Sequence, residues 1–246
     1  MINETIYILG NGKMARAIAK GLENNNIEVC YVLREKKEDI KNYILYNDFD
    51  ICGKICILCF KPYNLKEVSE KFINQSAKII ISPLARTTID DLKVFNASFY
   101  ARIMPNIAAE FNKSCTTYVF SDDTHEYAKL TLKIINILGS AIKCESENEL
   151  DLAMAINGSS PAFLAIIAEA IANAGVSIGL KNDKSYELTR ALFSSFESLI
   201  NNNHPAIIKE SVCSPAGVSI KGVEVLEEYK VRSAFLKAIK KSANKD

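Results

Sequence analysis

The sequence predicts an α/β fold in which an N-terminal Rossmann dinucleotide-binding domain is followed by an all-α domain. Two observations lead to this prediction. The chain opens with a short apolar strand pattern at residues 5–9, and a glycine turn and helical periodicity follow it directly. Strand and helix patterns then alternate until about residue 146, after which only helical periodicity remains. We therefore expect a Rossmann domain over residues 1–146 and a helical domain over residues 147–246.

The glycine turn has the spacing GxGxxA, formed by Gly10, Gly12 and Ala15. In a dinucleotide site the first glycine permits the tight turn, and the second lets the backbone approach the pyrophosphate. The small third residue lets the helix pack on the strand. The following helix, residues 13–23, would direct its N–H groups at the phosphates. An ordinary glycine turn of another α/β fold is the alternative. The predicted cofactor contacts here are Gly10, Asn11, Gly12, Lys13 and Met14.

The second strand, residues 28–33, ends where a Rossmann domain selects its cofactor. The next residue is Arg34, whose guanidinium suits a 2′-phosphate, so NADPH is the expected cofactor. Glu35 leaves NADH possible, because a small backbone shift would place its carboxylate at the ribose. Lys36 and Lys37 also fit a solvated charged turn.

Further strands are predicted at residues 55–60, 77–82, 98–103, 115–120 and 141–144, with helices at 62–74, 89–92 after a cap near Thr88, and 124–138. Ligands of open α/β sheets bind at the carboxyl ends of strands. Lys61 and Pro62 follow the third predicted strand, and Asn106 follows a later one, so we expect all three near the cofactor, with Asn106 near the nicotinamide. The helical half reads as helices at 149–156, 161–178, 186–201, 206–212, 217–228 and 231–241.

Composition excludes several classes of function. The net charge of +1 gives no electrostatic footprint for nucleic acid, and no polybasic patch suggests a membrane. The apolar stretch 161–180 could span a bilayer by length, but Glu169 and Asn173 in its middle favour a buried or subunit-interface helix. Cys52, Cys56 and Cys59 raise the question of a metal, yet two of them fall in an apolar strand and no fourth ligand is near. We expect no metal, and free thiols in a reducing cytoplasm; the N-terminus shows no signal peptide.

Five separated segments resemble the pyrroline-5-carboxylate reductase family. They are ILGNGKMARAIAKGL, ILCFKP, ARIMPNIAAE, NGSSPAFLAIIAEAIANAGVSIGL and SPAGVSIKGVEVLE. The family patterns that they resemble are IGxGxMAxA, ILAVKP, RxMPNTPA, SGSGPAF and SPGGTT. The segments occur in the family order and cover almost the whole chain, and the last two are specific to the family.

The resemblance implies a Rossmann domain followed by a helical dimerisation domain. It implies hydride transfer from NADPH or NADH to the imine carbon of 1-pyrroline-5-carboxylate, giving L-proline in the last step of proline biosynthesis. It also implies dimers or rings of dimers, with intertwined helical domains and an active site between subunits. The residues that would hold the substrate carboxylate are Ser159, Ser160, Gly217, Val218 and Ser219, and Ser160 and Ser219 are the candidate catalytic hydroxyls.

The residues themselves leave the role of the two serine turns open. Hydroxyls and amides at a helix start suit a carboxylate, and Ser and Pro are also common helix caps. His125 and His204 fall in no motif, so we expect no histidine acid. The hypothesis is that the imine binds protonated or is protonated through water, and that catalysis consists mainly of positioning.

The two substrate turns depart from the family pattern, whereas the cofactor turn is well kept. Asn157 and Ser160 replace a serine and a glycine of SGSGPA, and Ala216 and Val218 replace a glycine and a threonine of PGGTT. Ser219 keeps the second hydroxyl of the latter motif. A weaker reductase, a related cyclic-imine reductase and a non-catalytic NADP-binding paralogue are therefore alternatives.

Overall fold

The structure, a computed structural model, describes residues 2–244 and divides into two compact units between Gly158 and Ser159. We call the first the sheet unit and the second the helical unit. The helix α5, Glu147–Asn157, clusters with the sheet unit. The sequence predicted the domain boundary between residues 146 and 147, and α5 lies between that boundary and the division after Gly158. Met1 and Asp246, the outer ends of the two predicted domains, lie outside the described residues.

The sheet unit is built on an eight-stranded sheet with the order β10-β9-β8-β6-β4-β1-β2-β3. Neighbouring strands run parallel except β8 and β9, which are antiparallel. The strands are β1 Ile6–Leu9, β2 Val29–Leu33, β3 Tyr43–Leu45, β4 Ile55–Leu58, β6 Ile79–Ser82, β8 Tyr100–Met104, β9 Ser114–Phe120 and β10 Gly139–Lys143, and a separate pair is formed by β5 Ser76–Ala77 and β7 Asn96–Ala97. From β1 the chain moves outward through β2 and β3, and it then returns across β1 to continue in the opposite direction with β4. This is the topological switch point where doubly wound sheets bind ligands.

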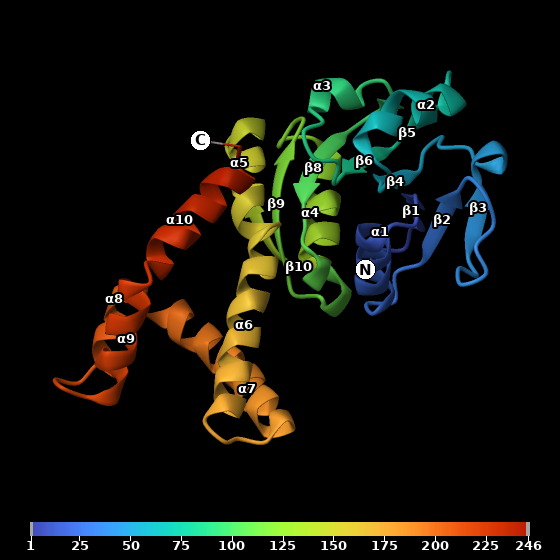
Figure 1. The fold of residues 1–246 in the computed structure, drawn as a ribbon. Helices are drawn as coiled ribbons and strands as arrows, with labels where there is room; N and C mark the ends of the chain where they lie inside the picture. Colours follow the sequence, from blue (N-terminus) through green and yellow to red (C-terminus); the bar gives the residue numbers. More distant parts are fainter. Residues whose placement is uncertain (1, 245–246) are drawn as a thin grey trace. The chain divides into compact units, whose positions relative to one another are not determined.

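Helices cover both faces of this sheet (Figure 1). Helix α1, Lys13–Glu23, and helix α4, Glu126–Leu138, pack into one core, and α2, Leu65–Ser69, and α3, Ile89–Leu92, contribute to the other. Alternate residues of a strand enter opposite cores. In β4, Ile55 and Ile57 face the α1 side, while Cys56 and Leu58 face the α2 side. Burial on both faces explains why the central strands read as continuous apolar runs.

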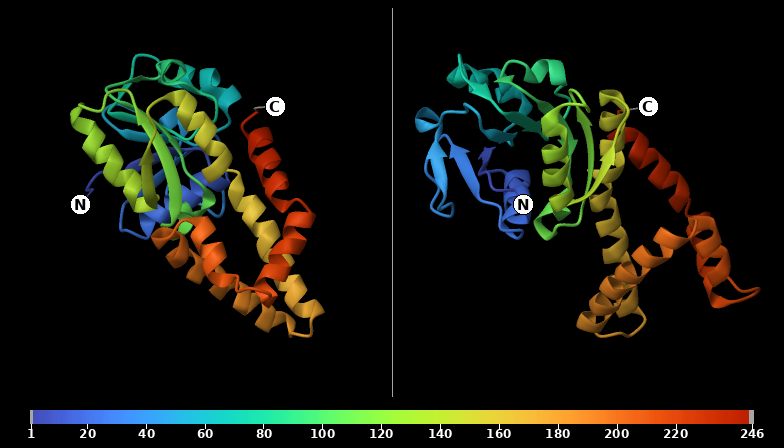
Figure 2. Two further views of the ribbon diagram at one scale, coloured as in Figure 1. Left: turned by 90° about the vertical axis from the view of Figure 1, so that its left-hand side faces the viewer. Right: turned by 180° about the vertical axis from the view of Figure 1, so that it is seen from behind.

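Helix α5 extends the layer on the α2 side over the end of the sheet. Its Leu150 is fully buried with Met104 of β8 and Val119 of β9. The adjacent residues Ile103 and Tyr118 point into the core that contains α4. Helices α4 and α5 therefore cover opposite faces of β8 and β9, as the second view of Figure 2 also shows.

The elements differ from the expectation mainly between β4 and β6. One helix was expected over residues 62–74, and the structure has three short pieces: η2 Pro62–Asn64, α2 Leu65–Ser69 and η3 Glu70–Phe72. The Glu70 N–H still donates to the Lys66 carbonyl in the α-helical pattern, and the chain continues from Glu70 as the 3-10 helix η3. The edge strand β3, three residues long, was not expected because so short a run carries little alternation.

The helical unit consists of α6 Ser160–Ser177, α7 Asn182–Asn202, α8 Pro205–Val212, α9 Val218–Glu228 and α10 Val231–Ser242. Helices α6 and α7 approach closely where the Ser185 hydroxyl donates to the Ala172 carbonyl at 2.6 Å, next to Gly175. Most other apolar side chains of this unit are exposed, among them Leu192 and Phe196. A unit of 88 residues that buries so little of its apolar surface needs another surface to cover it.

One stretch, Glu147–Ser177, is long and apolar enough to cross a membrane, with a mean hydropathy of 1.5. It comprises α5 and α6, and Glu169 lies within it. Length and composition alone are weak evidence for a membrane span, because core helices of soluble proteins meet the same criteria.

Candidate functional site

A cavity of about 710 Å³ lies at the carboxyl ends of β1, β2 and β4. Its size is that of a site for a drug-sized or larger ligand. Gly10, Asn11, Gly12, Lys13 and Met14 line it together with Arg34 and Lys61, so seven of the nine predicted cofactor residues share one cavity. The other lining residues are Ala15, Val32, Leu33, Glu35, Lys37, Tyr46, Leu58, Cys59, Phe60, Asn64, Pro83 and Leu84.

The glycine turn forms the floor of the cavity. Gly10 has φ +118°, and a Cβ there would lie 2.4 Å from the Cys59 carbonyl oxygen. The close approach is held by two backbone bonds, from Gly10 N to the Val32 carbonyl at 3.1 Å and from Cys59 N to the Leu9 carbonyl at 2.8 Å. At Gly12 a Cβ would meet nothing within 4 Å, so the backbone there is open. The open backbone at the N-cap of α1 fits a pyrophosphate group.

The end of β2 carries the charged side chains expected to select the cofactor. The Arg34 Nη2 lies 3.0 Å from Oε2 of Glu67, a residue of α2. Lys37 bonds the carboxylate of Glu35, and this bond lowers the pKa of Glu35 below its ordinary value. Two ion pairs therefore stand at this side of the cavity.

Several lining residues were not predicted, although some could have been. Phe60 and Cys59 end a predicted strand, and Pro83 and Leu84 follow another, so the rule that parallel strands end at one edge would have placed them here. Tyr46 follows the unpredicted β3, and nothing in its local pattern marks it. Burial raises the pKa of the Cys59 thiol and that of the Tyr46 phenol, which favours their neutral forms at neutral pH.

Pro62 and Asn106 are the two predicted cofactor residues outside the set that lines the cavity. Pro62 begins η2. The side chain of Asn106 accepts from Ala108 N at 3.1 Å and donates to the Asn157 carbonyl at 3.1 Å. Pro161 has no N–H with which to continue the helical bond to that carbonyl, so the Asn106 amide supplies a donor instead.

Asn157 anchors the end of α5 to the sheet. Its Nδ2 donates to the Met104 carbonyl at 2.5 Å and to the Cys115 carbonyl at 3.0 Å, while its Oδ1 is buried without a partner in the described structure. The asparagine that replaces the serine of the family motif is thus used to join α5 to β8 and β9.

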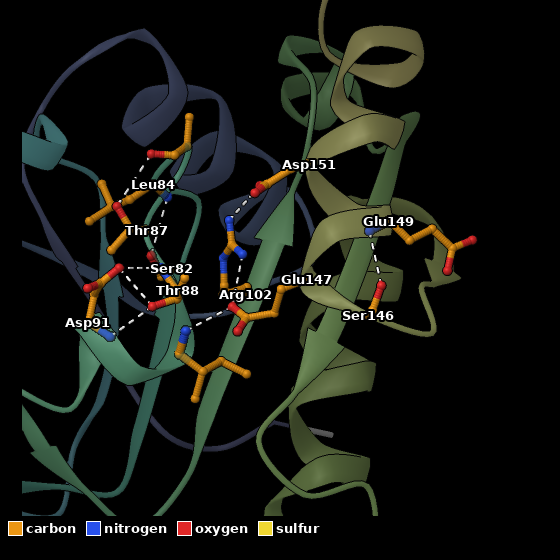
Figure 3. A network of polar contacts seen from close by, with 12 residues as sticks. Ser82, Leu84, Thr87, Thr88, Asp91, Arg102, Ser146, Glu147, Glu149 and Asp151 are labelled. Carbon is orange, nitrogen blue, oxygen red and sulfur yellow. Dashed lines mark hydrogen bonds and ion pairs between the residues drawn. The ribbon is translucent and has the colours of Figure 1, made fainter. Parts of the chain in front are cut away.

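A second tie between α5 and the sheet is the fully buried Arg102 of β8 (Figure 3). Its guanidinium bonds Glu147 at 2.9 Å and Asp151 at 2.7 Å, both on α5. Glu147 also accepts from the backbone N–H of Ile89, the first residue of α3. This network ties α3, β8 and α5 together and pairs the buried charge of Arg102 with two carboxylates.

The predicted substrate residues all lie in the helical unit, at the starts of two helices. Ser159 is the N-cap of α6, and Ser160 begins that helix; Gly217 is the N-cap of α9, which begins with Val218 and Ser219. The hydroxyl of Ser159 makes no capping bond among the described residues. The sequence left two interpretations of the serine turns open, helix capping and substrate binding. Capping by its hydroxyl does not explain Ser159.

The turn before α9 has a strained backbone. Ala216 has φ +57°, in the left-handed region that favours glycine. A Cβ on Gly217 would lie 2.3 Å from the Ser214 hydroxyl oxygen, so the turn is also tightly closed.

Both histidines are helix N-caps. His125 accepts from Tyr127 N at 3.2 Å at the start of α4, and His204 accepts from Ala206 N at 3.3 Å at the start of α8. In each the acceptor is Nδ1, so the neutral ring carries its proton on Nε2. Their capping bonds give both residues a structural role.

Comparison with known proteins covers both halves of the chain. Residues 147–246 match the family model for pyrroline-5-carboxylate reductase dimerisation, and residues 5–86 match the model for coenzyme F420-dependent NADP oxidoreductases. A pyrroline-5-carboxylate reductase of Helicobacter pylori is 32% identical over 256 residues, covering 98% of each chain. The chain belongs to the pyrroline-5-carboxylate reductase family.

Other members of the pyrroline-5-carboxylate reductase family agree in length and fold. The enzyme of Methanosarcina acetivorans is 29% identical, over 97% of this chain and 95% of its own. A solved reductase of Streptococcus pyogenes superposes with a TM-score of 0.82 at 27% identity, over 98% and 97% of the two chains. A Plasmodium falciparum pyrroline carboxylate reductase, solved with NADP bound, superposes with a TM-score of 0.86 at 23% identity, over 99% and 98%.

Membership of the reductase family makes one departure in the serine turns informative. Ala216 stands where the family motif has glycine, and its backbone has a positive φ that a glycine would adopt freely. The backbone at Ala216 therefore carries strain on the order of 1–2 kcal/mol. Backbone strain of this kind is common at functional sites.

Proposed function

We propose that this protein reduces 1-pyrroline-5-carboxylate to L-proline with NADPH as hydride donor, in the last step of proline biosynthesis. The observation that carries the proposal is the near-full-length match to curated reductases, which extends over both the cofactor half and the helical half. The cavity at the switch point supports the cofactor part independently, because its open glycine turn fits a dinucleotide. NADH remains a possible second donor, since Glu35 also lines the cavity.

The residues of the cavity would hold the cofactor by its charged parts. Bound NADPH supplies the hydride. The backbone at Gly12 and the N-terminus of α1 hold the pyrophosphate, and Lys13 adds a positive charge beside it. Arg34 binds the 2′-phosphate from the end of β2.

The helical unit would hold the substrate. The hydroxyls of Ser159, Ser160 and Ser219, with the amides around Gly217, bind the carboxylate of 1-pyrroline-5-carboxylate at two helix starts. With both histidines engaged as caps, the imine is protonated before it binds or through water, and catalysis consists of positioning.

A related cyclic-imine reductase is the second candidate function. Ala216 and Val218 replace residues of the family turn that would hold the substrate. Val218 lacks the threonine hydroxyl of the family motif, which removes one hydrogen-bond donor from the turn, and in this second candidate the preferred ring size shifts. A non-catalytic NADP-binding paralogue is the third reading of the same observation.

A purified-enzyme assay tests all three. We expect the protein to oxidise NADPH in the presence of 1-pyrroline-5-carboxylate, and to form L-proline in equal amount. A six-membered cyclic imino acid is tested at the same concentrations. If its kcat/KM exceeds that of 1-pyrroline-5-carboxylate, the protein is the related cyclic-imine reductase. Growth of a proline auxotroph on the expressed chain would exclude the non-catalytic paralogue. A folded protein that binds NADPH but oxidises none with either imine would overturn the proposal.

We also propose that the protein is a cytoplasmic homodimer, or a ring of dimers, with no membrane span. The dimerisation model that matches residues 147–246 and the exposed apolar side chains of that half support a second copy as the partner. The seven cysteines are unpaired, which suits a reducing compartment. Packing of α5 against β8 and β9 argues against membrane insertion of the stretch Glu147–Ser177. Cell fractionation would test both the location and the absence of a membrane anchor.

A further inference from the structure

The cations around the cofactor cavity fall into two groups. Lys13, at the glycine turn, and Lys61, after β4, form no ion pair within residues 2–244. Arg34 and Lys37, which both follow β2, are each paired with a carboxylate. The positive charge near the pyrophosphate is therefore available to any dinucleotide, while the positive charge at the end of β2 is already engaged.

The ion pair of Arg34 connects the cavity to a residue outside it. Arg34 lines the cavity, whereas Glu67 belongs to α2 and is not among the lining residues. The two side chains are half-exposed, at 52% and 55%, and share one contact of 3.0 Å. A guanidinium held in this way must release or share the carboxylate before it can form a paired contact with a phosphate.

We propose that Glu67 is a specificity-determining residue that limits the preference of this reductase for NADPH over NADH by engaging Arg34. The inference rests on the proposed function only in that the cavity binds these cofactors. The 2′-phosphate of NADPH competes with Glu67 for the guanidinium. The 2′-hydroxyl of NADH carries no charge, so NADH binds with the ion pair intact. Glu67 therefore weakens the binding of one cofactor and leaves the other unchanged.

Removal of the carboxylate tests the proposal. In Glu67→Gln, the dissociation constant for NADPH should fall about two- to fivefold, the range that an exposed ion pair is worth, while that for NADH should stay within about 1.5-fold. Both constants are measured by calorimetric titration, without substrate. The matched control is Glu70→Gln, which removes an exposed carboxylate three positions further along the chain and should change neither constant.

The effect must also depend on Arg34. In the Arg34→Gln background, Glu67→Gln should change the NADPH constant by less than about 1.5-fold, because the competing guanidinium is gone. Thermal unfolding of each variant shows whether it is folded.

Three results would overturn the proposal. They are an unchanged ratio of the two constants in Glu67→Gln, weaker NADPH binding in that variant, and an effect that survives in the Arg34→Gln background. Failure of the proposed reduction shows itself differently, as cofactor binding without turnover. Absence of binding by both cofactors would remove this inference and the cofactor assignment together.

Discussion

At the scale of single residues, Gly10 and Gly12 share one turn but meet different constraints. Gly10 combines φ +118° with a neighbouring carbonyl oxygen that a Cβ would approach to 2.4 Å. Gly12 has φ −68° and open space around it. We expect Gly10→Ala to lower the free energy of unfolding by about 2 kcal/mol or more, and Gly12→Ala to change it by less than about 0.5 kcal/mol. Urea unfolding of the two variants measures this difference.

The same pair separates folding from cofactor binding. Because the backbone at Gly12 is where the pyrophosphate would approach, Gly12→Ala should weaken NADPH binding although the protein remains stable. Normal NADPH affinity in a stable Gly12→Ala protein would contradict the placement of the pyrophosphate.

Ser219 is the hydroxyl that tests the substrate site. It begins α9 in the turn where Val218 lacks the hydroxyl of the family motif. If Ser219 donates to the substrate carboxylate, Ser219→Ala should lower kcat/KM by about 10- to 100-fold, the value of 1.5–3 kcal/mol for a hydrogen bond to a charged group. Steady-state kinetics with 1-pyrroline-5-carboxylate provide the measurement. Ser140→Ala, an exposed serine of β10, serves as control, and equal kinetics for both variants would remove Ser219 from the site.

Sequence reasoning identified the residues of the cavity that belong to a motif and missed those that the fold brings in. Gly10 to Met14 are adjacent in the chain, and Arg34 follows a strand whose role is fixed by its order. Tyr46 and Asn64 enter from unpredicted or irregular elements, so no local pattern marks them. The pairing of Arg34 with Glu67 joins residues 33 positions apart and depends on side-chain placement that periodicity does not contain.

At the scale of elements, the short helix α3 depends on its cap. Thr88 and Asp91 form a capping box in which each side chain accepts from the backbone N–H of the other. The N–H of Thr88 lowers the pKa of Asp91 in the folded protein. A lowered pKa means that Asp91 contributes stability above the pKa of the unfolded chain, about 3.9, and that this contribution is lost as the pH falls toward the folded value.

We therefore expect Asp91→Asn to be less stable than the wild type near neutral pH, and the difference to shrink as the pH falls below about 4. Urea unfolding at a series of pH values measures the difference. Asp90→Asn changes the net charge equally but leaves the capping box intact, so it controls for charge. A difference for Asp91→Asn that stays constant down to about pH 3 would contradict the assignment.

The tie between β8 and α5 is the second element-scale prediction. Arg102 is fully buried, and its two carboxylate partners on α5 are about one-third exposed. Arg102→Met should destabilise the protein by about 3 kcal/mol, because Glu147 and Asp151 would lose their counter-charge. Lys143→Met breaks a more exposed pair with Asp123 and should cost less than about 1 kcal/mol. Equal free energies of unfolding for the two variants would show that the buried network contributes little.

The boundaries of α1 and of the capped helix α3 were predicted, and the division of residues 62–74 into short pieces was not. Helix α1 runs over Lys13–Glu23 as expected, because its apolar positions recur at helical spacing and Asn24 follows them. Residues 62–74 carry a helix signal too, but Pro62 starts a 3-10 turn and tertiary burial of Val68 and Phe72 fixes short pieces. Where local preference is weak, packing decides the outcome.

At the scale of the whole molecule, the exposed apolar surface of the helical unit predicts the oligomeric state. Phe196 on α7 is 42% exposed, and Ile73 of the sheet unit is 65% exposed. If the helical unit forms the dimer, Phe196→Glu should reduce the measured mass toward the 27.3 kDa of one chain, while Ile73→Glu leaves it unchanged. Sedimentation equilibrium measures the masses.

Thermal unfolding gives a second check on assembly. The melting temperature of the wild type should rise with protein concentration, as it does for subunits that stabilise one another, and that dependence should weaken in Phe196→Glu. A wild-type protein that sediments as one chain at all concentrations would contradict the assignment of the helical unit as a dimerisation surface.

The division of the chain between Gly158 and Ser159 has a consequence for how the enzyme can change over evolutionary time. Every residue that lines the cofactor cavity precedes position 85, and every candidate substrate residue follows position 158. Recombination near this junction would exchange the segment that binds the cofactor separately from the segment that holds the candidate substrate residues. A lineage would then change the turns of the helical unit, as at Ala216 and Val218, while it inherits the nucleotide turn intact.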